Sequence, residues 1–330
     1  MKNSFFRTVI CVALVTILTS LCLNGALAET VKVAVVQPMS HTSLDQIRDT
    51  IVSSLEASGL DFEIVLKNAE RDTAALSAIL ENVKTDGVDI VVPIATNTAQ
   101  SAKVVFEDGD IPVVFAAVSD PVAAGLTGED SFFITGVSNN IPAAEIVKLI
   151  SDFQPDYKKI GFLYTSSETN SVSTINTAKA YCDEAGVAYE EVSIANLSEL
   201  QTGAETLISR GIDALYTGND NSIASAMSTY TDVAYGFGIP VYCGADSMVA
   251  DGGFATIGVD YVQLGKQVAD LVIRIAQGEL PENIPYETLS DYARFVNLQA
   301  ADTLGLTITD DILSAYKVLV EKDGTSHFGE

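Results

Sequence analysis

The sequence predicts an α/β protein made of two lobes, each built on a parallel sheet that helices cover on both faces. Beyond residue 30, short apolar runs rich in β-branched residues alternate with segments whose apolar residues recur at helical spacing. The alternation pauses at 132–138 and then restarts with a similar order of elements. A chain of 330 residues is long enough to fill two such cores.

The first α/β unit begins with the apolar run 31–36, and apolar residues then recur at helical spacing between 44 and 55. Thr42 or Ser43 can cap this helix, and Gly59 can end it. The same patterns predict the rest of the unit: strands at 62–66, 89–94 and 112–118, and helices at 76–83 and 98–106.

The second unit repeats this order without evident sequence identity to the first. Its predicted helices are 142–150, 172–185, 200–209 and 223–235, and its strands are 159–164, 188–194, 214–217 and 240–243. A further strand at 254–259, a helix at 264–275 and a last strand at 294–298 follow.

These late elements predict that the chain crosses between the lobes three times, near Ser138, near Val259 and within 280–292, which makes a three-strand hinge. We therefore expect a first lobe of residues 29–137 plus 260–281. The second lobe then comprises 138–259 plus 282–330. Nothing in the sequence indicates oligomerisation, so we expect a monomer.

The first 28 residues are typical of a secretory signal peptide. Lys2 and Arg7 precede an almost uncharged apolar stretch, 8–23, and the small-residue site Ala26-Leu27-Ala28 follows. A retained membrane helix is the alternative, but Asn24 and Gly25 interrupt the run. A lipid anchor on Cys22 is a third possibility. Each interpretation places the protein outside the cytoplasm, in the periplasm or at the cell surface.

Charge and cysteine content narrow the function further. The formal net charge is −26, which opposes binding to nucleic acid and to anionic lipid. Beyond the signal sequence only Cys182 and Cys243 occur, on different predicted elements. Two buried thiols are favoured over a disulfide.

Polar residues cluster in six loops that follow predicted strands. In parallel sheets ligands bind beyond the carboxyl ends of the strands, so these loops predict one cleft between the lobes. Any single Ser, Thr, Asn or Asp there can instead cap a helix. His41, which follows the first strand, could likewise be a ligand contact or a helix-start residue. Among the other polar residues of these loops are Thr96, Asn97, Ser119, Asp120, Asn170, Ser171, Asp220, Asn221 and Asp246.

The chemistry of these loops fits a zwitterion. Free N–H groups at helix N-termini suit a carboxylate, and Asp220 or Asp246 could accept hydrogen bonds from an ammonium. A sugar fits as well, because Asp and Asn also bind hydroxyls. Catalysis has little support, since the chain has only two His and no metal-ligand spacing, phosphate loop or nucleophile elbow. We expect no enzyme activity, no metal and no cofactor.

At these loops the sequence resembles the ABC-type substrate-binding proteins related to tryptophan- and tyrosine-binding components. The motifs that carry the resemblance span nearly the whole chain in the family's order, and the ordered set is specific although each motif alone is weak. They are His41-x-x-Leu44-Asp45, Ile94-Ala95-Thr96-x-x-Ala99-Gln100, Ala117-Val118-Ser119-Asp120-Pro121-Val122, Thr135-Gly136-Val137-Ser138, Ile160-Gly161-x-Leu163-Tyr164, Asn170-Ser171-Val172-Ser173, Asp220-Asn221-x-x-Ala224-Ser225-Ala226 and Ile257-Gly258-Val259-Asp260-Tyr261-x-x-Leu264-Gly265.

The resemblance implies a type I periplasmic binding protein of the Venus-flytrap kind, which delivers its ligand to an ABC permease with an ATPase. It also implies an amino acid ligand, and an aromatic one in particular. By position it implies Thr96, Asn97, Ser119, Asp120, Asn170, Ser171, Asp220, Asn221 and Asp246 as ligand-binding residues, and with His41 these are the ten candidate residues. A sugar or nucleoside is the alternative, and a secreted hydrolase is less favoured. An aromatic ligand needs apolar walls, for which Phe115, Tyr164, Tyr216 and Tyr242 are candidates; core packing is their other possible role, and we favour it for Phe115.

Overall fold

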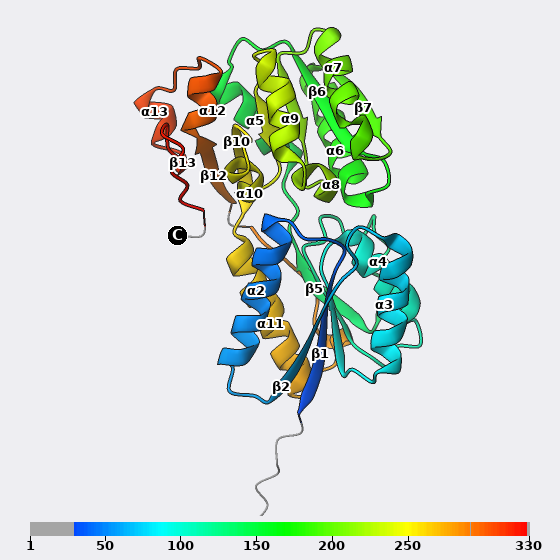
Figure 1. The fold of residues 1–330 in the computed structure, drawn as a ribbon. Coiled ribbons are helices and arrows are strands. Elements are labelled where there is room, and N and C mark those ends of the chain that lie inside the picture. Colours follow the sequence, from blue (N-terminus) through cyan, green and yellow to red (C-terminus); the bar gives the residue numbers. More distant parts are fainter. Residues whose placement is uncertain (1–29, 291, 329–330) are drawn as a thin grey trace, which may run out of the picture.

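Two α/β lobes lie one above the other in the structure, a computed structural model that describes residues 30–290 and 292–328 (Figure 1). The expected signal peptide and Cys22 fall outside the described residues. Within the described part, no helix is both long and apolar enough to cross a membrane.

The first lobe contains a six-stranded sheet in the order β11-β5-β4-β3-β1-β2, and all its neighbouring strands pair in parallel. Helices α2 and α11 pack on one face of this sheet, and α3 and α4 pack on the other (Figure 1). The elements are β1 (Val31–Gln37), α2 (Thr42–Ala57), β2 (Phe62–Asn68), α3 (Thr73–Thr85), β3 (Ile90–Pro93), α4 (Thr96–Val105), β4 (Val113–Ala116), β5 (Ile134–Ser138), α11 (Tyr261–Ala276) and β11 (Glu287–Thr288).

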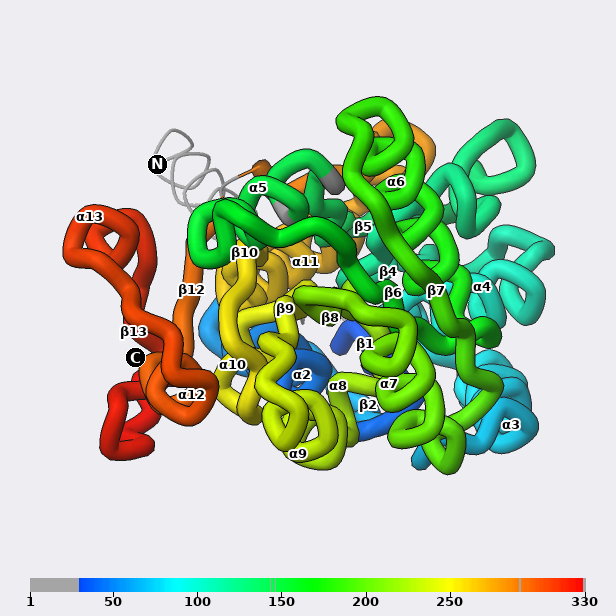
Figure 2. Tube along the Cα trace, turned by 90° about the horizontal axis from the view of Figure 1, so that it is seen from above, coloured from blue at the N-terminus to red at the C-terminus, as the bar shows by residue number. Residues whose placement is uncertain are grey.

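The second lobe contains a seven-stranded sheet in the order β13-β12-β10-β9-β8-β6-β7, in which only the β10–β12 pair is antiparallel. Figure 2 shows this lobe from above, with α7 and α9 on one side of the sheet and α5 and α6 on the other. The elements are α5 (Ala143–Phe153), β6 (Lys159–Thr165), α6 (Thr169–Ala185), β7 (Ala188–Ile194), α7 (Leu200–Ser209), β8 (Ala214–Thr217), α8 (Asn221–Ala224), α9 (Met227–Gly236), β9 (Val241–Cys243), α10 (Asp246–Ala250), β10 (Ala255–Val259), β12 (Tyr292–Asn297), α12 (Leu298–Thr303), α13 (Asp310–Leu313) and β13 (Lys317–Val320).

The central strands are buried along their whole length, which is why they appear in the sequence as continuous apolar runs. Phe115, Tyr216 and Tyr242 pack in these cores, and Tyr164 is half-buried beside Glu191 on β7. None of these four aromatic residues reaches the space between the lobes. Cys182 and Cys243 are both buried and unpaired, as expected.

The chain passes between the lobes after β5, after β10 and between β11 and β12. One predicted boundary differs from the structure. We expected the second lobe to resume at residue 282, but Glu287 and Thr288 pair with Val137 and Ser138 of β5 in the first sheet. The reason is that β11 is only two residues long, so it has no apolar period that a sequence pattern could reveal.

The C-terminal part also departs from the predicted pattern. Strand β13 was not expected, and the helix predicted at 223–235 is divided into α8 and α9. Within β12, Arg294 forms ion pairs with Asp152 at 2.7 Å and Glu145 at 3.1 Å, which join this strand to α5.

Candidate functional site

The topology of each sheet determines where its loops diverge. Strand order reverses between β1 and β3 in the first sheet and between β6 and β8 in the second. Loops leave in opposite directions at such points, which opens a crevice beyond the carboxyl ends of the strands. His41 and Thr96 lie beyond β1 and β3, and Asn170 and Asn221 lie beyond β6 and β8, so the two crevices face each other.

The crevices meet in a narrow cleft between the lobes that encloses only about 20 Å³ of free space. Residues from all six polar loops line it. The lining comprises His41, Ser43, Leu44, Ile47, Thr96, Ala117, Ser119, Asn139, Asn170, Asn219, Asp220, Asn221, Ala224, Ala245, Met248 and Tyr261.

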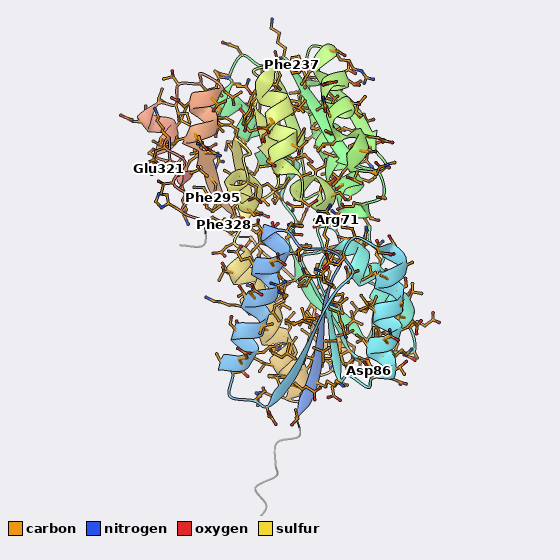
Figure 3. All side chains as sticks on the ribbon, viewed as in Figure 1. Arg71, Asp86, Phe237, Phe295, Glu321 and Phe328 are labelled. Carbon is orange, nitrogen blue, oxygen red and sulfur yellow. The ribbon has the colours of Figure 1, made fainter. Side chains whose placement is uncertain are left out.

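Six of the ten candidate residues therefore lie together in this cleft: His41, Thr96, Ser119, Asn170, Asp220 and Asn221. Asn97 lines a larger outer cavity of about 610 Å³, which Arg71 also lines at the border between the lobes (Figure 3). Asp120 lies on the opposite edge of the interface.

Ser171 and Asp246 do not line the cleft, and each has a structural reason. Ser171 is fully buried and donates to Asp220. In α10 the helical period turns Ala245 and Met248 toward the cleft and Asp246 away from it. Burial raises the pKa of Asp246 to about 6.

Most of the apolar side chains that line the cleft were not predicted from the sequence. Leu44 and Ile47 come from α2, Met248 from α10 and Tyr261 from the start of α11. Leu44 and Ile47 belong to the apolar stripe of α2, which predicted only that this face packs against the core. They also line the cleft because the second lobe lies close to the first turns of α2. Tyr261 lies next to the predicted chain crossing near Val259, and this nearness to the hinge was the one sequence feature that could have placed it at the cleft.

Three helices that begin near the cleft lack a side-chain cap. The N-cap residues of α2, α4 and α6 are His41, Ala95 and Glu168, and none of their side chains bonds to its own helix's first turn. Helix α3, by contrast, is capped by Asp72. Ala95 and Ala117 also have positive φ angles of 72° and 58°. Such strained backbone is commonly found at ligand clamps.

Asp220 is a buried residue that bonds to several parts of the second lobe at the cleft. Its carboxylate accepts from the backbone N–H groups of Thr165 at 2.6 Å and Ile223 at 2.9 Å, and from the hydroxyls of Thr165 and Ser171. It thus joins the end of β6 to the starts of α6 and α8. Burial, and secondarily the charge of Glu168, raise its pKa to about 7.

His41 is held in place from both lobes. Its Nε2 lies 3.1 Å from Asn221 Oδ1 across the cleft. Burial lowers the pKa of His41, against the opposing effects of the Asn221 hydrogen bond and of Glu168, Asp45 and Asp251.

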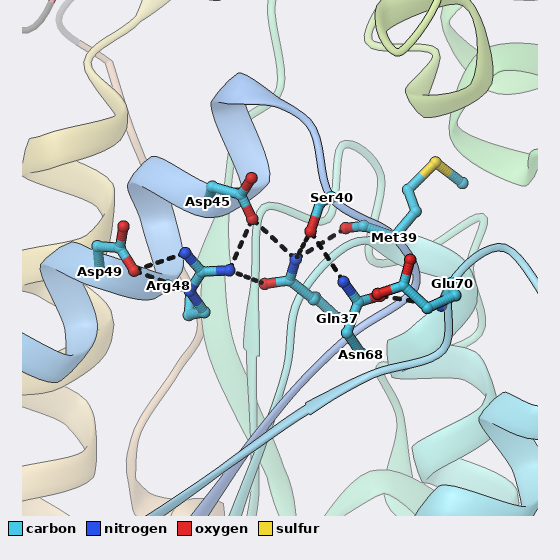
Figure 4. A network of polar contacts seen from close by, with 8 residues as sticks. All are labelled: Gln37, Met39, Ser40, Asp45, Arg48, Asp49, Asn68 and Glu70. Atoms are coloured by element: carbon cyan, nitrogen blue, oxygen red, sulfur yellow. Dashed lines mark hydrogen bonds and ion pairs between the residues drawn. The ribbon is translucent and has the colours of Figure 1, made fainter.

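Behind His41, buried Gln37 at the end of β1 donates to Met39 O, Ser40 Oγ and Asp45 Oδ1 and accepts from Arg48 (Figure 4). The same network joins Asn68 to Ser40. The loop that carries His41 is therefore ordered before any ligand contact.

Several polar atoms of the cleft have no hydrogen-bond partner among the described residues. They are His41 Nδ1, Thr96 Oγ1, Asn170 Oδ1 and Asn219 Oδ1, all buried. Buried polar atoms in proteins are normally paired, and leaving one unpaired costs about 1–3 kcal/mol. Four such atoms in one cleft indicate groups that bond to a ligand.

Side chains of the two lobes meet around this cleft. Thr42 donates to Asp251 at 2.9 Å and Ser173 to Asp120 at 2.8 Å. Ser43 and Ser247 share a hydrogen bond between their hydroxyls. The lobes are therefore in a closed arrangement.

Residues 32–319 match the family model for ABC transporter substrate binding proteins. The chain belongs to this family. This match confirms the resemblance expected from the sequence, and the two lobes of mostly parallel strands confirm the fold class. Members of the family bind small-molecule ligands outside the cytoplasm and work with an ABC permease.

Two relatives of this substrate-binding protein are described by an amino acid ligand. It is 29% identical over 272 residues to the tyrosine-binding protein of Clostridioides difficile, covering 80% of this chain and 78% of that protein. A solved structure from Streptococcus pneumoniae in complex with L-Trp is 31% identical with a TM-score of 0.82, covering 88% of this chain and 99% of that one.

A ligand-free, open structure from Clostridium difficile is similar in sequence but differs more in shape. That chain, a substrate-binding protein with adhesive properties, is 29% identical over the same shares of 88% and 99%, yet its TM-score is 0.67. The lower score at nearly equal identity agrees with the closed arrangement of the lobes seen here.

Proposed function

We propose that this substrate-binding protein captures an aromatic amino acid between its lobes, as a monomer without enzyme activity, and delivers it to an ABC permease. The observation that carries the proposal is the combination of unpaired polar atoms and an apolar wall in one closed cleft. The names of its relatives, a tyrosine-binding protein and an L-Trp complex, support the aromatic class.

The carboxylate of the ligand would bind at the start of α4. This ten-residue helix has no side-chain cap, and its first N–H groups carry partial positive charge. Thr96, at its first position, is 2% exposed, and its hydroxyl has no partner among the described residues. Both features suit an anion with two oxygen acceptors.

The aromatic side chain would lie between α2 and α10. Leu44, Ile47, Met248 and Tyr261 supply the apolar wall there, and each is nearly or fully buried. Aromatic rings gain from such contacts through burial of large apolar area. A sugar or nucleoside, the alternative, would leave this wall against hydroxyl groups.

A thermal-shift panel tests the proposal. The purified protein is heated with L-Trp, L-Tyr and L-Phe, and separately with sugars and nucleosides. A ligand present at about a hundredfold over its Kd stabilises the folded protein by about 2.7 kcal/mol. We expect stabilisation by an aromatic amino acid. Stabilisation by sugars or nucleosides alone would overturn the proposal.

A matched pair of variants tests the carboxylate site. Thr96→Val keeps the side-chain shape but removes the hydroxyl, and we expect affinity to fall roughly fivefold to a hundredfold. Thr98→Val is the control, because Thr98 Oγ1 is also buried without a partner among the described residues but does not line the cleft. Equal effects of the two variants would remove Thr96 from the site.

A further inference from the structure

Glu168 is a buried carboxylate that contacts several polar groups of the cleft without lining it. It is 3% exposed and stands just before α6. One oxygen, Oε1, accepts from the backbone N–H and the hydroxyl of Ser222 at 2.8 and 2.7 Å. The other, Oε2, accepts from Asn221 N at 2.9 Å and from two side-chain amides.

Those two amides belong to Asn170 and Asn221, whose Nδ2 atoms lie 3.2 and 2.8 Å from Glu168 Oε2. A carboxylate oxygen attracts the NH₂ end of an amide and repels its oxygen. Glu168 therefore fixes the orientation of both amides, so that each Oδ1 faces away from it. Asn170 is held further by a bond from Nδ2 to Asn219 O at 2.6 Å.

The orientation of Asn221 then determines the tautomer of His41. Asn221 Oδ1 can only accept, so the His41 Nε2 that lies 3.1 Å from it must carry the hydrogen. A neutral imidazole holds one ring hydrogen, which leaves Nδ1 as a lone-pair acceptor. This Nδ1 is buried in the cleft and has no partner among the described residues.

We propose that Glu168 is a positioning residue that, through Asn221, sets the tautomer of His41, and that the acceptor cluster so formed selects the primary ammonium of an amino acid. The inference rests on the proposed function and adds the group that recognises the amine. The cluster comprises His41 Nδ1, Asn170 Oδ1 and Asn219 Oδ1, three unpaired acceptors that match the three N–H donors of an ammonium.

The cluster also explains why the ligand should be an amine and not a sugar. A hydroxyl brings one donor together with acceptor lone pairs, so it leaves part of an all-acceptor cluster unsatisfied. Unpaired buried acceptors reduce affinity strongly, and the cluster therefore discriminates against ligands that lack the amine.

Histidine NMR tests the tautomer directly, because the chain contains only His41 and His327. Protein labelled with ¹⁵N-histidine is measured at neutral pH when saturated with L-Tyr, and His327→Gln assigns the signals. A locked variant, Ser43→Cys with Ser247→Cys, is measured without ligand, because these two hydroxyls already meet across the lobes. We expect the Nε2–H tautomer in both samples. The Nδ1–H tautomer or an imidazolium would overturn the proposal.

Affinity measurements test the selection. Glu168→Gln should weaken binding of L-Tyr roughly tenfold to a hundredfold, yet change binding of its deaminated analogue, 3-(4-hydroxyphenyl)propionate, much less. Glu191→Gln is the control, since Glu191 bonds to Lys179 away from the cleft. Equal losses for both ligands would mean a structural role only and would refute the selection.

Failure of this inference can be told apart from failure of the proposed function. If no aromatic amino acid binds the protein, the proposed ligand is wrong, while the locked variant still reports whether Glu168 and Asn221 set the tautomer. If the amino acid binds but the tautomer differs, the proposed function stands and the positioning role of Glu168 is wrong.

Discussion

Replacing Ser171 with Ala should destabilise the fold by an amount that depends on pH. The Ser171 hydroxyl donates to Asp220 Oδ2 at 2.9 Å in a fully buried position. When Asp220 is ionised, this is a hydrogen bond to a charged group and contributes about 1.5–3 kcal/mol. Once the carboxyl is protonated, the bond is between neutral groups and contributes only about 0.5–1.5 kcal/mol.

The direction of the pH effect follows from the raised pKa of Asp220, about 7 compared with an ordinary value of 3.8. Between these two values the folded state holds a proton that the unfolded state has lost, so wild-type stability increases as the pH falls from 7 toward 4. Ser171→Ala removes one donor from the ionised form. The loss of stability should therefore be largest above pH 7 and should shrink on acidification.

Urea unfolding followed by circular dichroism, at pH 8.5 and 5.5 and without ligand, measures both values. Ser173→Ala is the matched control on the same helix, since its hydroxyl bonds to Asp120 at a part-buried position. We expect a control loss below about 1 kcal/mol. The same loss for Ser171→Ala at both pH values, or a larger loss at pH 5.5, would refute the assignment of a charged Asp220. Ligand affinity at pH 8.5 should change little, because Ser171 does not line the cleft.

Two other perturbations follow from the packing and charge of the cleft. Gly265→Ala would place a Cβ 2.7 Å from Thr50 Cβ and 3.1 Å from Ile47 O, so α2 must move away from α11. We expect the free energy of unfolding to fall by about 1–3 kcal/mol and ligand binding to weaken. Melting curves measure the loss against the control Gly236→Ala, whose Cβ meets nothing within 4 Å. Acidification should weaken amino acid binding as it protonates His41, because burial holds its pKa below the ordinary 6.5 despite the nearby charges of Glu168, Asp45 and Asp251. Affinity should fall as the pH drops below about 6.5 in wild type and should fall much less in His41→Gln; an equal pH profile for the two proteins would contradict this role.

Much of the fold could be predicted from the sequence because its central strands are buried on both faces. Strands such as β3 and β8 are short apolar runs between polar loops, and helices such as α2 carry a regular apolar stripe. Strand β11 has no such signature, because pairing at a sheet edge does not require a run of apolar residues. Its position depends on where the chain must cross back to the second lobe.

The candidate site was predictable at the level of loops but less so at the level of side chains. Polar residues at strand ends identified His41, Thr96 and Asn170, since the carboxyl ends of parallel strands meet on one edge. The same rule also selected Ser171, which does not line the cleft but donates a hydrogen bond to Asp220, a residue that does. It passed over Glu168, because Glu168 bonds to residues of its own loop and of the loop after β8, and only the folded chain brings these two loops together.

The structure also explains why closure should depend on the ligand. The hydrogen bonds that join the lobes near the rim, such as Thr42 to Asp251 and Asn97 to Ser167, involve exposed groups that bond equally well to water in an open form. Closing the lobes without a ligand buries the unpaired atoms of the cleft, each at a cost of about 1–3 kcal/mol. A zwitterion that pairs with Thr96 from the first lobe and with Asn170 from the second removes this cost from both sides. The free energy of closure is thus supplied mainly by groups that can be satisfied only when the amino acid bridges the two lobes.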